Sequence, residues 1–232
     1  MTDGAAAQPG TVLYHFRHSI VGFFEFPTEN AVRILPPFLQ PVEPHHSQSV
    51  LSVMAFDFHD SMVGAYGELI LCVGVAPSIE GGRLPRGAFY PFLLGTTTRA
   101  SREHAIGRWH LPHFMEDIEL DFQTGNGEVR LAAAHGGKPI VNMRITEYAW
   151  EPAQHLYQSY MRDASGAYMA KILMEAPFSE HEEERGELEI HEHPFTTAID
   201  RDAVTTTPFR ELWMRDGLQT FHPLQQLSRP AT

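Results

Sequence analysis

The sequence lacks several features that mark particular classes of protein. Cys72 is the only cysteine in 232 residues, which excludes a disulfide framework and a thiolate metal cluster and favours a reducing, intracellular setting. No apolar run approaches the roughly 18 residues that a membrane-spanning helix needs. The stretch MTDGAAAQPG lacks the positive and apolar regions of a signal peptide. We therefore expect a cytoplasmic protein.

Positive charge is scarce as well. The formal net charge is -12, which disfavours nucleic acid and anionic membranes as partners because both attract positive surfaces. Lysine occurs only at Lys138 and Lys171. We expect Lys138 at the tip of a hairpin, in solvent, and Lys171 in the middle of a strand. Any chemistry that needs a lysine nucleophile therefore has few candidates in this chain.

The residues that are present predict a folded, mainly β protein. Apolar residues make up 43% of the chain and aromatic residues 11%, which is typical of a globular protein with a sizeable core. Residues 11–26, 49–58 and 68–75 are rich in β-branched and aromatic types. The last of these segments, within ELILCVGV, is almost entirely apolar and is expected to be buried on both faces of a sheet.

Two pairs of strands are predicted further along the chain. The segment EVRLAAAHGGKPIVNMRITEY (128–148) has the pattern of two strands joined by a Gly-Gly turn. AYMAKILMEA (167–176) and GELEIHEHPF (186–195) resemble a second pair, joined by a polar run. The pattern therefore favours a closed or strongly curved sheet over a helical fold.

Helices are expected to be few and short. PTENAVRILPPF has Thr28 as a candidate N-cap and prolines that end the helix, and TTTRASREHAIG has Thr98 as a cap and Gly107 as a terminator. We find no internal repeat and no linker that would separate domains. The expected organisation is a tail at 1–10, one β domain at 11–223 and a second tail at 224–232.

Three stretches of the sequence resemble acetoacetate decarboxylase-like proteins. FPTENAVRILPPFLQPV matches that family's short helix ending in Leu-Pro-x-x-Leu, and SVLSVMAFDFHDSMVGAYGELILCVGV contains a strand and the Gly-x-Tyr-x-Glu turn. HAIGRWHLPHFMEDIEL resembles the Gly-Arg-Glu helix end followed by Pro-Lys-Lys. The resemblance covers roughly residues 13–200. It implies a curved β-barrel or cone with a buried pocket, often assembled into homo-oligomers.

The resemblance also implies positions for the family's functional residues. The family uses a lysine of lowered pKa to form a Schiff base with a ketone, beside a second lysine, an arginine and two glutamates. By gap-free counting the arginine falls on Arg17 and one glutamate falls on Val53, whereas the other glutamate is Glu68 of the Gly-x-Tyr-x-Glu turn. The two lysines after the proline fall on His113 and Phe114, and the glutamate after Gly-Arg falls on Trp109. The segment between Gly-Arg and the proline is two residues shorter here. No lysine stands at the nucleophile position, so standard acetoacetate decarboxylation is disfavoured.

The residues at these positions suggest acid/base chemistry without an imine. Arg17 could grip an anionic oxygen, while Glu68 and His113 could transfer protons. Tyr66, Trp109 and His110 are expected to line the pocket with Phe114 and Val53. Such a site suits a lyase, isomerase or cyclase acting on a small β-dicarbonyl or polyketide-like substrate in secondary metabolism, with no cofactor. The reactions left open include aldol-type cyclisation with dehydration and decarboxylation without an imine. Arg17 and Glu68 could also form a purely structural ion pair.

Two other functions remain open from the sequence. The same scaffold could bind a small carbonyl compound without turning it over. The HEH motif could instead place His191 and His193 on one face of a strand, as in the metal site of a cupin-like barrel. The positions where a cupin-like barrel would supply a further ligand are occupied by threonine and alanine, so we expect no bound metal.

Overall fold

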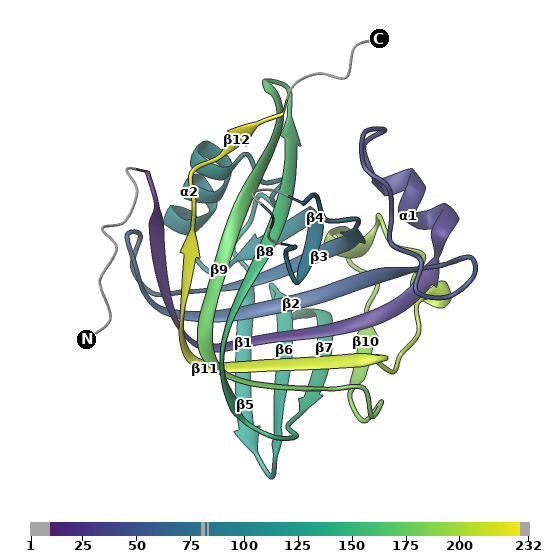
Figure 1. Cartoon of the computed structure of the whole chain (residues 1–232). Helices are drawn as coiled ribbons and strands as arrows, with labels where there is room; N and C mark the ends of the chain where they lie inside the picture. Colours follow the sequence, from purple (N-terminus) through teal and green to yellow (C-terminus); the bar gives the residue numbers. More distant parts are fainter. Residues whose placement is uncertain (1–9, 80–81, 83, 228–232) are drawn as a thin grey trace.

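The architecture is described from a computed structural model, which places residues 10–79, 82 and 84–227 (Figure 1). Seven long strands form its main body. They are β1 (Val12–Pro27), β2 (Gln48–Ser61), β3 (Tyr66–Val75), β4 (Gly87–Thr96), β8 (Glu151–Asp163), β9 (Gly166–His181) and β11 (Arg210–Phe221). Their order around the sheet is β11-β1-β2-β3-β4-β8-β9, and a further pairing between β11 and β9 closes it into a barrel. All neighbours are antiparallel except β4 and β8. The expected closed, mainly β fold is confirmed.

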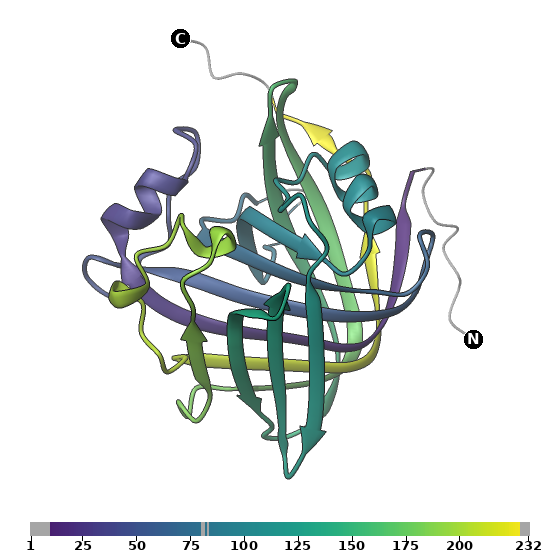
Figure 2. The ribbon, with the colours of Figure 1, turned by 180° about the vertical axis from the view of Figure 1, so that it is seen from behind.

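A second, smaller sheet covers the outside of this barrel. It has the order β10-β7-β6-β5, formed by β5 (Glu119–Gly125), β6 (Glu128–His135), β7 (Lys138–Thr146) and β10 (Glu187–Ile190). Figure 2 shows these strands in front of the barrel wall. Two short 3-10 turns, Pro194–Thr196 and Arg201–Ala203, follow β10, and β12 (Gln225–Gln226) pairs with β9.

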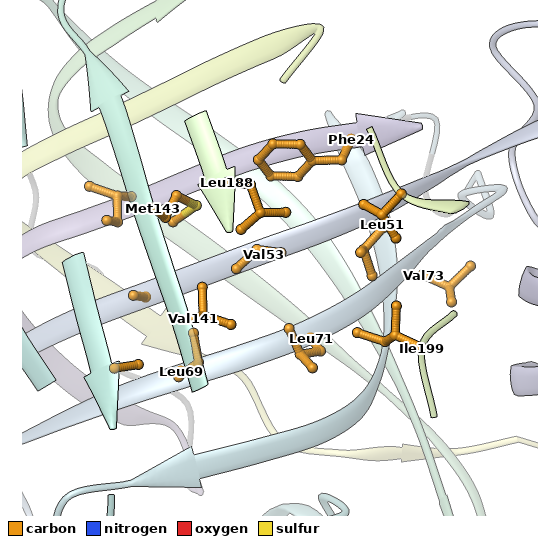
Figure 3. Close-up of a cluster of buried hydrophobic side chains, with 14 of the residues drawn as sticks. Phe24, Leu51, Val53, Leu69, Leu71, Val73, Val141, Met143, Leu188 and Ile199 are labelled. Atoms are coloured by element: carbon orange, nitrogen blue, oxygen red, sulfur yellow. The ribbon is translucent and has the colours of Figure 1, made fainter. Parts of the chain in front are cut away.

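The strands of the covered wall are buried on both faces, and their residues alternate between two cores. On β2, Leu51, Val53 and Ala55 pack against the smaller sheet, whereas Met54 and Phe56 face the barrel lumen. Figure 3 shows the outer core, in which β2 and β3 side chains meet those of β7 and β10. Continuous apolar runs result because neither face of these strands meets water.

Helix α2 (Arg99–Trp109) lies beside the barrel and positions several lumen residues. Its N-terminus is capped as expected, because Thr98 Oγ1 accepts a hydrogen bond from the backbone N–H of Ser101 at 3.2 Å. Gly107 does not end the helix. The chain leaves it at His110, which adopts a left-handed conformation with φ of 54°. The following residues run along β4, where Leu94 bridges to His113.

Other local predictions have mixed outcomes. The hairpin of β6 and β7 is confirmed, with Gly136 and Gly137 both at positive φ in its turn. Thr28 is the first residue of α1 (Thr28–Ile34) rather than its cap, and its hydroxyl accepts a hydrogen bond from Ser49 Oγ. The predicted pairing of residues 167–176 with 186–195 is wrong. β9 pairs with β8, β11 and β12, whereas β10 pairs with β7.

The ends of the chain and its helices complete the fold. Gln225 and Gln226, which lie in the segment expected to be the C-terminal tail, form β12. Residues 1–9 and 228–232 lie outside the described part. Among the residues that the structure places, no helix has the length and apolar character required to cross a membrane.

Candidate active site in the barrel lumen

A cavity of about 70 Å³ lies inside the barrel beside α2. We call it the proximal chamber. β3 contributes Tyr66 and Glu68, β1 contributes Tyr14, and α2 contributes His104 and Trp109. The alternation of β3 explains this arrangement, because Tyr66 and Glu68 share the face that looks into the lumen while Gly67 between them faces Leu120 on the other side.

Glu68 is the carboxyl group of this chamber. Burial raises its pKa from 4.5 to about 8, because the charged form loses its hydration inside the barrel. Among the described residues, none forms an ion pair or a hydrogen bond with its side chain. Glu68 is therefore mostly protonated at neutral pH, and its pKa lies where one group can either donate or accept a proton.

A chain of hydrogen bonds joins three other side chains of the chamber. Trp109 Nε1 donates to Tyr14 Oη at 2.7 Å, and Tyr14 Oη lies 2.7 Å from His104 Nε2. Burial lowers the pKa of His104, with a smaller contribution from Arg108, so its imidazole is neutral at pH 7. We therefore assign Tyr14 as the donor to Nε2 of His104.

The remaining ionisable groups of the chamber are uncharged at neutral pH. Burial raises the pKa of Tyr66 well above its ordinary value, and the nearby Glu68 adds to the shift. Burial likewise raises the pKa of the Cys72 thiol well above its usual range. The chamber therefore offers neutral hydroxyl, carboxyl, thiol and imidazole groups in an apolar enclosure.

Three of the predicted site residues lie in the proximal chamber, namely Glu68, Tyr66 and Trp109. The predicted pair of Arg17 and Glu68 is wrong. A β-bulge between Phe16 and His18 turns Arg17 outward, where its side chain is 58% exposed and lies 3.3 Å from Asp57. A gap-free count along the sequence cannot detect such a bulge.

Val53 also lies outside the lumen. It is fully buried in the outer core, between β2 and the smaller sheet (Figure 3). Its neighbour Met54 lines the proximal chamber instead. Because side chains alternate along a strand, an error of one position in the count moves a residue to the opposite face.

Three further predicted residues do not line the proximal chamber, namely His113, Phe114 and His110. His113 Nε2 is 3.3 Å from Thr96 Oγ1, and burial lowers the pKa of its imidazole. Phe114 packs against His193 and other rings of the outer core. His110 stacks on Tyr168 and binds a carboxylate of β8. The structure thus does not bring His113 to Glu68 as a second group lining the chamber.

The lysines and the HEH histidines are likewise away from the lumen. Lys138 is exposed at the start of β7, and Lys171 lies between Ala170 and Ile172, which face the lumen. β10 ends at Ile190, so His191 and His193 do not share a strand face. His191 contacts Glu189 and Asn142, whereas His193 caps the first 3-10 turn. No group of three or more metal-binding side chains is arranged around a common point within the described ranges.

Two residues of the site were not predicted from the sequence. Tyr14 gave no motif, and His104 stands in a polar helix where it resembles a surface residue. The only available signal was the position of Tyr14 on the same face of β1 as Phe16, which becomes informative once that face is known to line the lumen.

Comparisons with known proteins support the same fold. No protein-family model matches the sequence, and no curated protein sequence matches it. The structure is similar to an acetoacetate decarboxylase from Legionella pneumophila, with a TM-score of 0.62 at 14% identity over 96% of this chain and 88% of that one. It is also similar to an acetoacetate decarboxylase-like enzyme from Sphingomonas wittichii RW1, with a TM-score of 0.60 at 9% identity over 98% and 97% of the chains.

A third similar structure is the enduracididine biosynthesis enzyme MppR complexed with pyruvate. Its TM-score is 0.59 at 13% identity, covering 97% of this chain and 93% of that one. The chain therefore has the acetoacetate decarboxylase-like fold.

Proposed function

We propose that the protein is an enzyme of the acetoacetate decarboxylase-like type that acts by proton transfer on a small carbonyl compound, without an imine intermediate. The observation that carries this proposal is Glu68, a carboxyl group enclosed in the proximal chamber without a cationic partner among the described residues. A purely structural carboxyl group would be expected to have a hydrogen-bonding partner, because an enclosed polar group without one is unfavourable.

The surrounding groups supply what proton abstraction next to a carbonyl requires. In the proposed step, ionised Glu68 takes a proton from the carbon beside the carbonyl group, and the electron pair of that bond moves to the carbonyl oxygen. The Tyr14 hydroxyl, which in the resting site donates to His104 Nε2, turns its hydrogen bond to that oxygen and stabilises the negative charge, and Glu68 then passes the abstracted proton to the oxygen to give the enol. Trp109 holds the Tyr14 oxygen in place. The resulting enol is the shared intermediate of isomerisation, aldol-type cyclisation with dehydration, and related lyase reactions.

A solved structure of the same fold supports the proposal of carbonyl chemistry. MppR has been solved with the condensation product of pyruvate and imidazole 4-carboxaldehyde. This chain differs from lysine-dependent family members in that no lysine is among the described residues that line the proximal chamber. The proposal therefore retains carbonyl activation and replaces the imine with hydrogen bonding.

Hydrogen–deuterium exchange tests the proposal without knowledge of the natural substrate. Methyl ketones such as butan-2-one and heptan-2-one are incubated with the protein in D2O, and loss of the hydrogens beside the carbonyl is followed by NMR. Glu68→Gln should lower the catalysed rate by roughly 100- to 10,000-fold. Glu103→Gln, at an exposed position on α2, is the matched control and should leave the rate unchanged. Equal rates in wild type and Glu68→Gln would refute the assignment.

Binding without turnover is the second candidate function. It is favoured by one specific observation, namely that Arg17 and His113, two of the three predicted catalytic groups, lie outside the proximal chamber. A binding protein would hold carbonyl compounds but show no exchange above the protein-free rate. Calorimetric titration beside the exchange assay separates the two functions.

A further inference from the structure

A second cavity lies inside the same barrel. We call it the distal chamber; it also measures about 70 Å³. Met54, Phe56, Phe89, Ile172 and Gln219 line both chambers, so the two are adjacent. Their combined volume is close to the roughly 150 Å³ of a cavity that accepts a benzene molecule.

The distal chamber is almost entirely apolar but contains an unpartnered hydroxyl group. Val21, Met174, Leu212 and Met214 form much of its wall. Ser19 also lines it and is only 1% exposed, yet its hydroxyl has no hydrogen-bonding partner among the described residues. A buried polar atom of this kind is unfavourable unless something else supplies the missing bond.

Gln219 occupies the boundary between the chambers. Its side chain is buried and lines both of them, and none of the described residues forms a hydrogen bond with it. An amide can donate to one oxygen and accept from another hydroxyl. Gln219 is therefore placed to bind a polar group in the middle of a molecule that extends through both chambers.

The two chambers contain no positive charge to balance an anionic ligand. None of the described residues that line them is lysine or arginine. Two guanidinium groups lie nearby without lining either chamber. Arg108 donates from Nη2 to the Gly10 carbonyl, although its Nε has no partner among the described residues, and Arg86 is paired with Glu180. A carboxylate that entered the lumen would lose its hydration without gaining a counterion.

We propose that the lumen binds an uncharged, elongated carbonyl compound whose apolar tail fills the distal chamber and carries an oxygen that bonds to Ser19. The reacting carbonyl lies beside Glu68, and this placement rests on the proposed function. Met54, Met174 and Met214 allow the wall to adjust, because an unbranched thioether side chain fills irregular space with little strain. The ligand class thus differs from a short anionic β-keto acid.

A chain-length series tests the tail. Acetylacetone, hexane-2,4-dione, heptane-2,4-dione and octane-2,4-dione are titrated calorimetrically near pH 6.5, beside acetoacetate and 3-oxooctanoate as anionic probes. Affinity for the diones should rise about fourfold per added methylene until the distal chamber is full. The anions should bind at least tenfold more weakly than the diones of similar length. A flat series, or equal affinity for anions, would overturn the proposal.

Substitutions in the distal chamber locate the effect. Leu212→Phe fills this chamber without touching the proximal one, so acetylacetone should bind as before while the gain with chain length disappears. Val21→Phe is a second filling variant in case Leu212→Phe fails to fold. Retention of the full gain in a folded filling variant would contradict the placement of the tail.

The hydroxyl of Ser19 is tested separately with 8-hydroxyoctane-2,4-dione. Wild type should prefer this compound over octane-2,4-dione by about fivefold, the value of one ordinary hydrogen bond. Ser19→Ala should abolish the preference. Ser52→Ala is the matched control, because the Ser52 hydroxyl is also buried, has no partner in the part of the chain that the structure describes, and lines neither chamber. These titrations are independent of turnover, so loss of exchange activity and loss of chain-length dependence are separate outcomes.

Discussion

Replacing Glu68 by glutamine should change how the stability of the protein depends on pH. Burial raises the pKa of Glu68 from 4.5 to about 8. The protonated carboxyl is therefore favoured in the folded state, and its contribution to stability is fully present below pH 4.5. This contribution is lost as the pH rises through about 8, because the unfolded chain releases its proton more readily.

The size of the effect follows from linkage. Each unit of pKa difference corresponds to about 1.4 kcal/mol, so Glu68 should remove about 4 kcal/mol from the free energy of unfolding between pH 5 and pH 9. Glu68→Gln keeps the size of the side chain but cannot ionise. Its free energy of unfolding should therefore decrease less than that of wild type over this range, whatever the effect of the substitution at pH 5.

Urea denaturation at pH 5, 6, 7, 8 and 9, followed by tryptophan fluorescence, measures this difference. Glu103→Gln serves as the control, since its exposed carboxylate should give the wild-type pH dependence. The quantity to compare is the change of the unfolding free energy with pH in each variant. Groups that titrate in the same way in both variants do not contribute to the difference. If the unfolding free energies of wild type and Glu68→Gln changed with pH in parallel, the Glu68 carboxyl would have an ordinary pKa in the folded protein. The argument for its acid/base role would then be refuted.

Three further predictions concern other parts of the chain. Borohydride with acetoacetate should neither inactivate the protein nor add mass to it, because neither lysine lines the proximal chamber: Lys138 is exposed and Lys171 lies on the outward side of β9. An adduct detected by mass spectrometry would contradict this expectation. Glu211→Ala should lower the free energy of unfolding by about 3–5 kcal/mol in urea titrations, since this buried carboxylate accepts backbone hydrogen bonds from the end of β7 and from the loop before β10, and a change below 1 kcal/mol would refute that role. His104→Phe should reduce the rate of hydrogen–deuterium exchange in the ketones at least tenfold, whereas His113→Ala should reduce it less than threefold. The reverse order would indicate that His113, and not His104, takes part in proton transfer.

The sequence predicted the class of fold because the strand signals in this chain are strong. The apolar run of β3 and the Gly-Gly turn between β6 and β7 each follow from local pattern. Thr98 is a cap for the same local reason. The pairing of β9 was mispredicted because a local sequence pattern does not indicate which distant strand is the partner. β10 pairs with β7 instead of β9.

The candidate site was only partly predictable for geometric reasons. Glu68 and Tyr66 were found because they belong to a turn motif that continues directly into a lumen-facing strand. Arg17 was misplaced by one bulge and Val53 by one step of strand alternation. His104 reaches the lumen through the docking of α2 beside Tyr14, a tertiary contact that no local pattern could indicate.

The pairing of β1 with β11 has a consequence for how this protein can be synthesised. Val12 lies opposite Phe221 in that pair, so the wall of the lumen joins residues that are about as far apart in sequence as the described chain allows. Contacts of such long separation form slowly, because a large loop must close before they contribute. The ribosome must release β11 before the barrel can close. Until then β1 and β9 expose strand edges that can pair with other chains. The nascent protein is therefore prone to aggregate before the barrel closes.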